Sequence, residues 1–151
     1  MALVAPLLCT ILFGSVELGS YYYNEHILRK AVRDGARYAA RQSFTLYTCS
    51  GAPGGTVVAD TQALVRTSLL SGGTDRFVDI QNGDVTLTTS CKTTEGGESM
   101  VNGIYKGMAT GAPIVEVAAT VDYSPVLGTA FGFSGVGFHM RASEQAAVMG
   151  I

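Results

Sequence analysis

Residues able to do covalent chemistry are few and scattered in this chain of 151 residues. The Walker A, His-Glu-x-x-His and Gly-x-Ser-x-Gly patterns do not occur in it. The glycines between residues 128 and 137 have the wrong spacing for a dinucleotide-binding loop, and Ser134 has only His139 near it in sequence. We therefore expect no catalytic residue, no enzyme activity and no cofactor, and interpret the chain as a binding or assembly protein.

The three cysteines differ in their surroundings. Cys9 lies in an apolar run, where a small packed thiol is expected. Cys49 and Cys91 lie about 40 residues apart outside that run, and in an oxidising compartment we expect them to form a disulfide. The alternative is two unrelated free thiols. No Cys-x-x-Cys pair occurs, and His26 and His139 stand alone, so we expect no metal site.

The N-terminal segment is an apolar run that ends at a carboxylate. Residues 1–16 carry no charged side chain, Glu17 follows, and the first cation is Arg29. Since a basic flank normally precedes a secretory signal or a membrane anchor, we expect that a leader has been removed or is not included. We expect the run to anchor the chain and to drive assembly through Leu3, Val4, Leu7, Leu8, Ile11, Leu12, Phe13 and Val16.

Glu17 is the only charge of that apolar region. In a packed core of helices we expect its carboxylate to pair with the N-terminal ammonium or a cation of another copy, because an unpaired buried charge is costly. The alternative is a carboxylate that reaches the membrane interface or is protonated. Tyr21, Tyr22 and Tyr23 follow, and they suit either a membrane-interface belt or packing against the rest of the chain.

Apolar residues recur at spacings of three and four from Ile27 to Ala39, which predicts a continuous helix over residues 2–43. This segment has five cations and three anions (+2), whereas residues 44–151 have five cations and nine anions (−4). A stripe of cations four residues apart is interpreted as an intersubunit charge surface, and the alternative is a solvated helix face: Arg29, Arg33, Arg37 and Arg41. The net charge of −2 argues against nucleic-acid binding.

Residues 44–151 are predicted to form an α+β head. A helix is expected from a Thr56 cap to Gly72, and the Asn82-Gly83 pair predicts a hairpin between residues 77–80 and 85–91. Strands are expected over residues 115–123, which alternate, and 137–149, with Phe138, Met140 and Ala142 facing inward. We expect an antiparallel sheet covered by the second half of the N-terminal helix, and a long loop over residues 92–113.

Three segments together resemble the TadE-like family, pilin-like proteins of the tight-adherence pilus system: Ala2-Leu-Val-Ala-Pro6, Phe13-Gly-Ser-Val-Glu-Leu-Gly19 and Ala31-Val-Arg-Asp-Gly-Ala-Arg-Tyr-Ala39. The ending Ala142-Ser-Glu-Gln-Ala-Ala-Val-Met-Gly150 is also similar to that family's close. The resemblance implies insertion through an apolar helix, cleavage by a prepilin-type peptidase, and handling by a pilus assembly machinery.

The sequence thus predicts a type IV pilin-like protein with an anchor and filament-core helix over residues 1–43 and a disulfide-closed head over residues 44–151. We expect a homo-oligomeric helical filament, or association with other pilins, that leaves the bacterial inner membrane for the cell surface and serves adhesion. The alternative is a low-abundance, membrane-anchored minor pseudopilin that primes or assists assembly of a pilus made of another protein.

Overall fold

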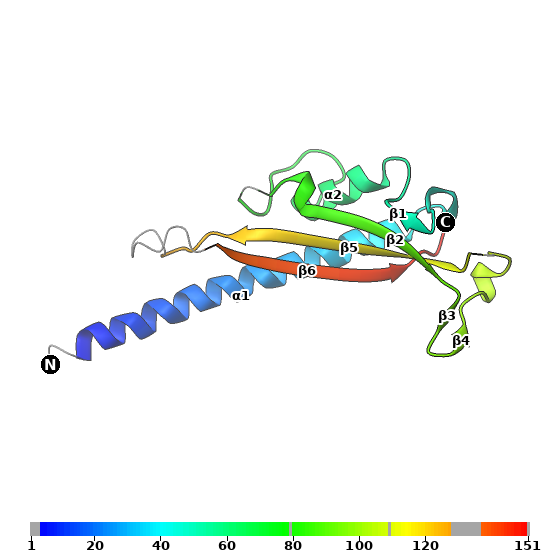
Figure 1. Ribbon diagram of the computed structural model, residues 1–151. Helices are drawn as coiled ribbons and strands as arrows, with labels where there is room; N and C mark the ends of the chain where they lie inside the picture. The colour runs from blue at the N-terminus through cyan, green and yellow to red at the C-terminus, as the bar shows by residue number, and fades with distance from the viewer. Residues whose placement is uncertain (1–3, 79, 109, 128–136, 151) are drawn as a thin grey trace.

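The chain folds as an α+β protein in which one very long helix runs along a small sheet (Figure 1). The structure is a computed structural model that describes residues 4–78, 80–108, 110–127 and 137–150. Its longest element is α1 (Val4–Ala40), and the N-terminal half of α1 projects past the end of the sheet. The predicted layout, a long protruding N-terminal helix packed on a small antiparallel sheet, is confirmed.

The two halves of α1 have different surroundings. Its buried side chains all lie in the C-terminal third, three or four residues apart, so that one face of the helix meets the sheet: Leu28, Ala31, Val32, Gly35, Ala36, Ala39 and Ala40. Most of them are small, which lets the helix backbone come close to its neighbours. The helix ends three residues before the predicted boundary, where the last turn tightens and the amide of Gln42 donates to the carbonyl of Ala39.

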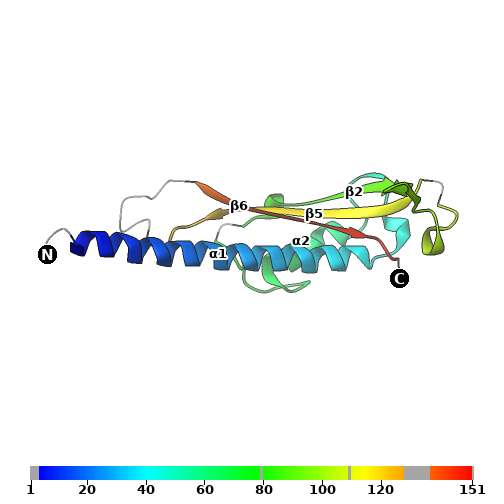
Figure 2. The same ribbon diagram turned by 90° about the horizontal axis from the view of Figure 1, so that it is seen from below.

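The sheet has four antiparallel strands in the order β1-β2-β5-β6. They are β1 (Ser50–Gly51), β2 (Val85–Lys92), β5 (Ala112–Tyr123) and β6 (Phe138–Ala147). Alternation places the odd-numbered residues of β5 from Val115 to Tyr123 on the buried face. Figure 2 shows α1 as one layer and the sheet as the other, so the core lies between them.

The second helix, α2 (Val57–Thr67), lies in the helical layer, where it contacts α1 and β2. Thr61 and Val65 of α2 are fully buried. They face Gly35 of α1, where an added Cβ would lie 2.7 Å from Cγ2 of Val65. The absence of a side chain at Gly35 therefore sets how closely the two helices cross.

The prediction for residues 69–84 was wrong in two places. The helix ends at Thr67 because Ser68 adopts a left-handed conformation (φ 69°), and Leu69 and Leu70 are exposed. Of the strand predicted over residues 77–80, the described residues 77, 78 and 80 lie in no strand. Asn82–Asp84 is a short 3-10 turn, η2, that leads into β2, whose described partners are β1 and β5. The Thr56 hydroxyl also makes no cap, because it donates to the Asp60 carboxylate (2.7 Å).

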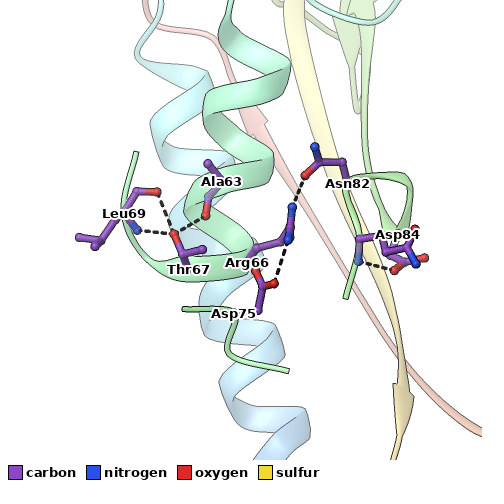
Figure 3. Close-up of polar contacts among 8 residues, drawn as sticks. Ala63, Arg66, Thr67, Leu69, Asp75, Asn82 and Asp84 are labelled. Atoms are coloured by element: carbon purple, nitrogen blue, oxygen red, sulfur yellow. Dashed lines mark hydrogen bonds and ion pairs between the residues drawn. The ribbon is translucent and has the colours of Figure 1, made fainter. Parts of the chain in front are cut away.

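One arginine explains why the Asn-Gly signal failed. Arg66 of α2 donates to the side chain of Asn82 (2.6 Å) and to the carboxylate of Asp75 (2.8 Å), as Figure 3 shows. The Asp84 carboxylate accepts from the amide of Gln81 (2.7 Å) and closes the turn. Tertiary hydrogen bonds to α2 therefore hold this segment beside the helix, where a two-residue hairpin cannot form.

The described part of residues 92–113, predicted as a long loop, contains regular structure. It contains the hairpin β3 (Thr94–Glu95) and β4 (Glu98–Ser99), followed by the 3-10 turn η3 (Gly103–Tyr105). Met140 of β6 is buried and Ala142 packs against the core, as predicted, but Phe138 is 54% exposed at the end of the strand. Phe138 shares the inner face with Met140, as predicted, but it lies at the open end of the sheet and is not buried there.

We expect Gly35→Ala to destabilise the protein by about 1–3 kcal/mol, because overpacking against Val65 outweighs a helix-propensity gain of about 1 kcal/mol. Gly19→Ala is the matched control, since nothing lies within 4 Å of its added Cβ. Denaturant unfolding in detergent micelles measures both. Val65→Ala should offset part of the loss when combined with Gly35→Ala; strict additivity of the two substitutions would contradict the close crossing.

Candidate assembly and anchor site

The N-terminal half of α1 carries large apolar side chains that are about half exposed in the described structure. The exposed fractions of its large side chains lie between 47% and 61% for Val4, Leu7, Leu8, Ile11, Leu12 and Val16. Phe13 is half-buried, and Leu3 lies outside the described residues. Among the residues described, α1 is the one helix long and apolar enough to cross a membrane, and none of its most apolar stretch is buried.

Glu17 marks the point where this surface meets the head. Its carboxylate accepts the hydroxyl of Tyr123 at 2.6 Å and the amides of Val126 at 3.1 Å and Leu127 at 3.0 Å. These donors follow each other at the end of β5, 106 to 110 residues further along the chain. In the single chain, neutral donors of its own head therefore hold the carboxylate. The expected pairing with a cation or the N-terminal ammonium of another copy stays a prediction.

Local structure explains why the donors converge. Tyr123 is the last residue of β5, and strand alternation turns its side chain towards α1. There it makes an edge-to-face contact with Tyr21, with ring centroids 5.3 Å apart. Pro125 has no amide to offer, so the next two amides, of Val126 and Leu127, are the first that reach the carboxylate.

The contact changes the acidity of Tyr123. Burial first, and then the hydrogen bond and the negative charge of Glu17, raise the pKa of Tyr123 to about 12. The phenol therefore stays protonated at physiological pH and remains a donor. Three donors on one carboxylate give a charge-assisted network, which holds the end of the sheet against the helix at this level.

The cationic stripe is exposed and only partly paired. Arg29 forms an ion pair with Glu25 (2.6 Å), and Arg33 approaches Glu144 of β6 (3.9 Å). Among the described contacts Arg37 and Arg41 have no ion pair, and both are exposed. Surface pairs of this kind contribute about 0–1 kcal/mol each, so the stripe adds little to the fold.

The two head cysteines form a disulfide at the far end of the sheet. Ser50 pairs with Ser90 in the β1–β2 register, so Cys49 and Cys91 are the next opposite positions, with their Cα atoms 5.0 Å apart. In the chain-entropy model a loop of this length contributes about 4 kcal/mol. Cys9 is a free, exposed thiol on the apolar half of α1.

Within the described ranges no three His, Cys, Asp or Glu side chains lie together as a metal site. His139 contacts Asp122 on the outer face of the sheet, and His26 is exposed on α1. Ser134 and the glycines from residue 128 to residue 135 lie outside the described residues.

Sequence reasoning identified Glu17 but missed Tyr123, Val126 and Leu127. The alternation of β5 did place Tyr123 on the inner face, so one signal was available. Two of the three donors are backbone amides, which leave no trace in side-chain patterns. The distance of more than 100 residues between donor and acceptor removed any local clue.

Residues 1–37 match a family model described as TadE-like protein. The match covers the apolar run, Glu17 and part of the cationic stripe, and it confirms the resemblance seen in the sequence. Comparison with curated proteins and with solved structures found no significant match.

We expect Glu17→Gln to lower the free energy of unfolding by about 1–3 kcal/mol, because the amide keeps the shape but cannot accept all three donors with a full charge. Tyr123→Phe should cost about 1–2 kcal/mol. Since the two groups touch, the double variant should lose less than the sum. Denaturant unfolding tests this, with Glu25→Gln, whose partner Arg29 is exposed, as a near-neutral control. Additive losses would refute a direct contact.

Alkaline pH should weaken the fold. Tyrosines in the unfolded chain ionise near pH 10, whereas Tyr123, and Tyr47 through burial and the nearby Tyr38, have a pKa raised to about 12. The stability they contribute is fully present below about pH 10 and is lost as pH rises to about 12. Urea unfolding should show a falling free energy over this window and a shallower fall in Tyr123→Phe. An identical pH dependence in that variant would contradict the assignment.

Proposed function

We propose that the protein is a structural subunit of a cell-surface pilus-like filament and polymerises through its N-terminal apolar helix. The observation that supports this best is the uncovered half of α1, with six large apolar side chains about half exposed. Exposure of a continuous apolar surface to water is unfavourable, at roughly 1.5–3 kcal/mol for each large side chain. The surface needs an apolar environment outside its own chain.

Two environments fit in succession. Lipid surrounds residues 4–16 while the subunit is anchored in the bacterial inner membrane, and neighbouring helices replace lipid in the filament. The match of residues 1–37 to a TadE-like protein model supports a role with the tight-adherence pilus, its prepilin-type peptidase and its assembly machinery. Further copies of this chain, or other pilins, are the partners of the apolar helix, and the heads lie outside on the cell surface.

The cationic stripe provides a surface for electrostatic contact with the head of another copy. Arg37 and Arg41 are exposed and lack a described ion pair, while residues 44–151 carry a net charge of −4. In a filament these side chains face the acidic head of the next copy, where they favour one orientation over others. Arg29 and Arg33 keep partners in their own chain and contribute less.

A second function is a low-abundance minor pseudopilin that primes a pilus made of another protein. The contact at Glu17 favours it, because a subunit whose apolar-region charge is satisfied by its own head needs no second copy for that purpose. The two functions differ in how much of the chain a pilus contains.

Electron microscopy of sheared surface material, with mass spectrometry of its main protein, tests the proposal. Filaments composed mainly of this chain support the structural subunit. Trace amounts in filaments of another protein, and loss of those filaments when the gene is deleted, support the minor pseudopilin. Filaments that form normally without the chain and never contain it would overturn both.

We expect a chain lacking residues 1–15 to be a soluble, folded monomer. The buried core of α1 begins at Leu28, and this truncation keeps Glu17 with its head contacts. Light scattering and circular dichroism should report a monomer with helix and strand signals. Filaments formed by the truncated chain would show that the heads, rather than the apolar helices, hold the polymer together.

A further inference from the structure

We propose that the end of the head beside Glu17 is itself a membrane-contacting surface, which enters the headgroup layer of a lipid bilayer while α1 is anchored there. We define the tip surface as Leu18, Tyr22, Tyr23, Val126 and Phe138. The inference rests on the membrane-anchored stage of the proposed function and adds a second contact to it, made by the sheet and not by the anchor helix alone.

The tip surface collects exposed apolar and aromatic side chains from three elements. Three are on α1, one follows β5 and one begins β6, and their exposed fractions lie between 54% and 68%. Figure 1 shows the end of β5 and the start of β6 at the same end of the head, beside the projecting half of α1. The register pairs Phe138 with Tyr123, which in turn binds Glu17.

No linker separates the apolar helix from the head. Val16 is still an exposed apolar residue, and at the very next residue the carboxylate of Glu17 is held by the amides of Val126 and Leu127 at 3.1 and 3.0 Å. When residues 4–16 lie in hydrocarbon, Glu17 lies at its boundary. The end of the sheet is fixed at the same level, so it meets the headgroups.

The chemistry at this level suits an interface. Tyr22 and Tyr23 carry an apolar ring and a polar hydroxyl, the combination enriched where membranes meet water. The three donors on Glu17 let a carboxylate stay at the boundary without a partner from lipid or another chain.

The arrangement around the helix favours lipid over a second copy. Leu18 and Tyr23 are five residues apart and point about 140° apart around the axis, while Val126 and Phe138 lie on the sheet. A neighbouring subunit would cover only one side of the tip surface. A bilayer surface surrounds the helix and contacts all sides at one level, continuous with the apolar surface of residues 4–16.

The chain contains no tryptophan, so a single introduced tryptophan reports its own position. We would compare V126W and F138W with two controls. L8W lies on the apolar half of α1, and I104W is an exposed position, at 60%, in η3. The start of β5 lies about 36 Å from Tyr123 along the strand. Residue 104 precedes that start, so it lies at the opposite end of the head.

The full-length variants are reconstituted at low density in phosphatidylcholine vesicles with or without brominated acyl chains. We expect emission shifted to shorter wavelength, and a loss of fluorescence with bromolipid, for L8W, V126W and F138W but not for I104W. Bromines near the headgroups should quench V126W most strongly, and bromines near the chain ends should quench L8W.

Three results would overturn the inference. Quenching of L8W with water-like, unquenched emission from V126W and F138W would leave the membrane anchor in place and remove the tip contact. A tip signal that appears only at high protein-to-lipid ratio would assign the tip to contacts between copies. An unquenched L8W would reject the anchored stage as well, and the proposed function with it.

Discussion

The contact between Glu17 and the end of β5 determines how this protein divides into an anchor and a head. A carboxylate directly after an apolar run is costly unless its charge is satisfied. Here the Tyr123 hydroxyl and two backbone amides satisfy it, and they lie at or just after the C-terminal end of β5. One polar site therefore ends the apolar surface and fixes the head at that level of α1.

The parts of α1 before and after Glu17 differ in how their side chains are packed. Towards the C-terminus, small residues such as Ala36 and Gly35 let the sheet and α2 approach closely, so the helix is part of the head core. Towards the N-terminus, large side chains face outward and no part of the described head covers them. The helix is nevertheless continuous from Val4 to Ala40, and only the surroundings of its side chains change.

Sequence patterns predicted the elements better than their contacts. The apolar spacing of α1 and the alternation of β5 follow from single-element burial, so both were visible without a structure. The Asn82-Gly83 hairpin was wrong because hydrogen bonds from Arg66 on another helix outweighed a local turn preference. The donors to Glu17 could not be predicted for a related reason. Two are backbone amides, and the course of β5 along α1 places them beside a residue more than 100 positions earlier in the sequence.

A satisfied Glu17 also changes what assembly has to supply. An apolar helix that leaves lipid for other helices gains little from hydrophobic burial, since lipid chains are as apolar as leucine. Pairing of Glu17 with a charge of another copy would add a driving force and fix the register, but neutral donors of its own head already hydrogen-bond the carboxylate. Close packing remains. At Gly14 and Gly19 no described atom from outside their own stretch of α1 lies within 4 Å of an added Cβ. Neighbouring helices can therefore approach closely there, and in the proposed filament shape rather than charge would set the register of the core.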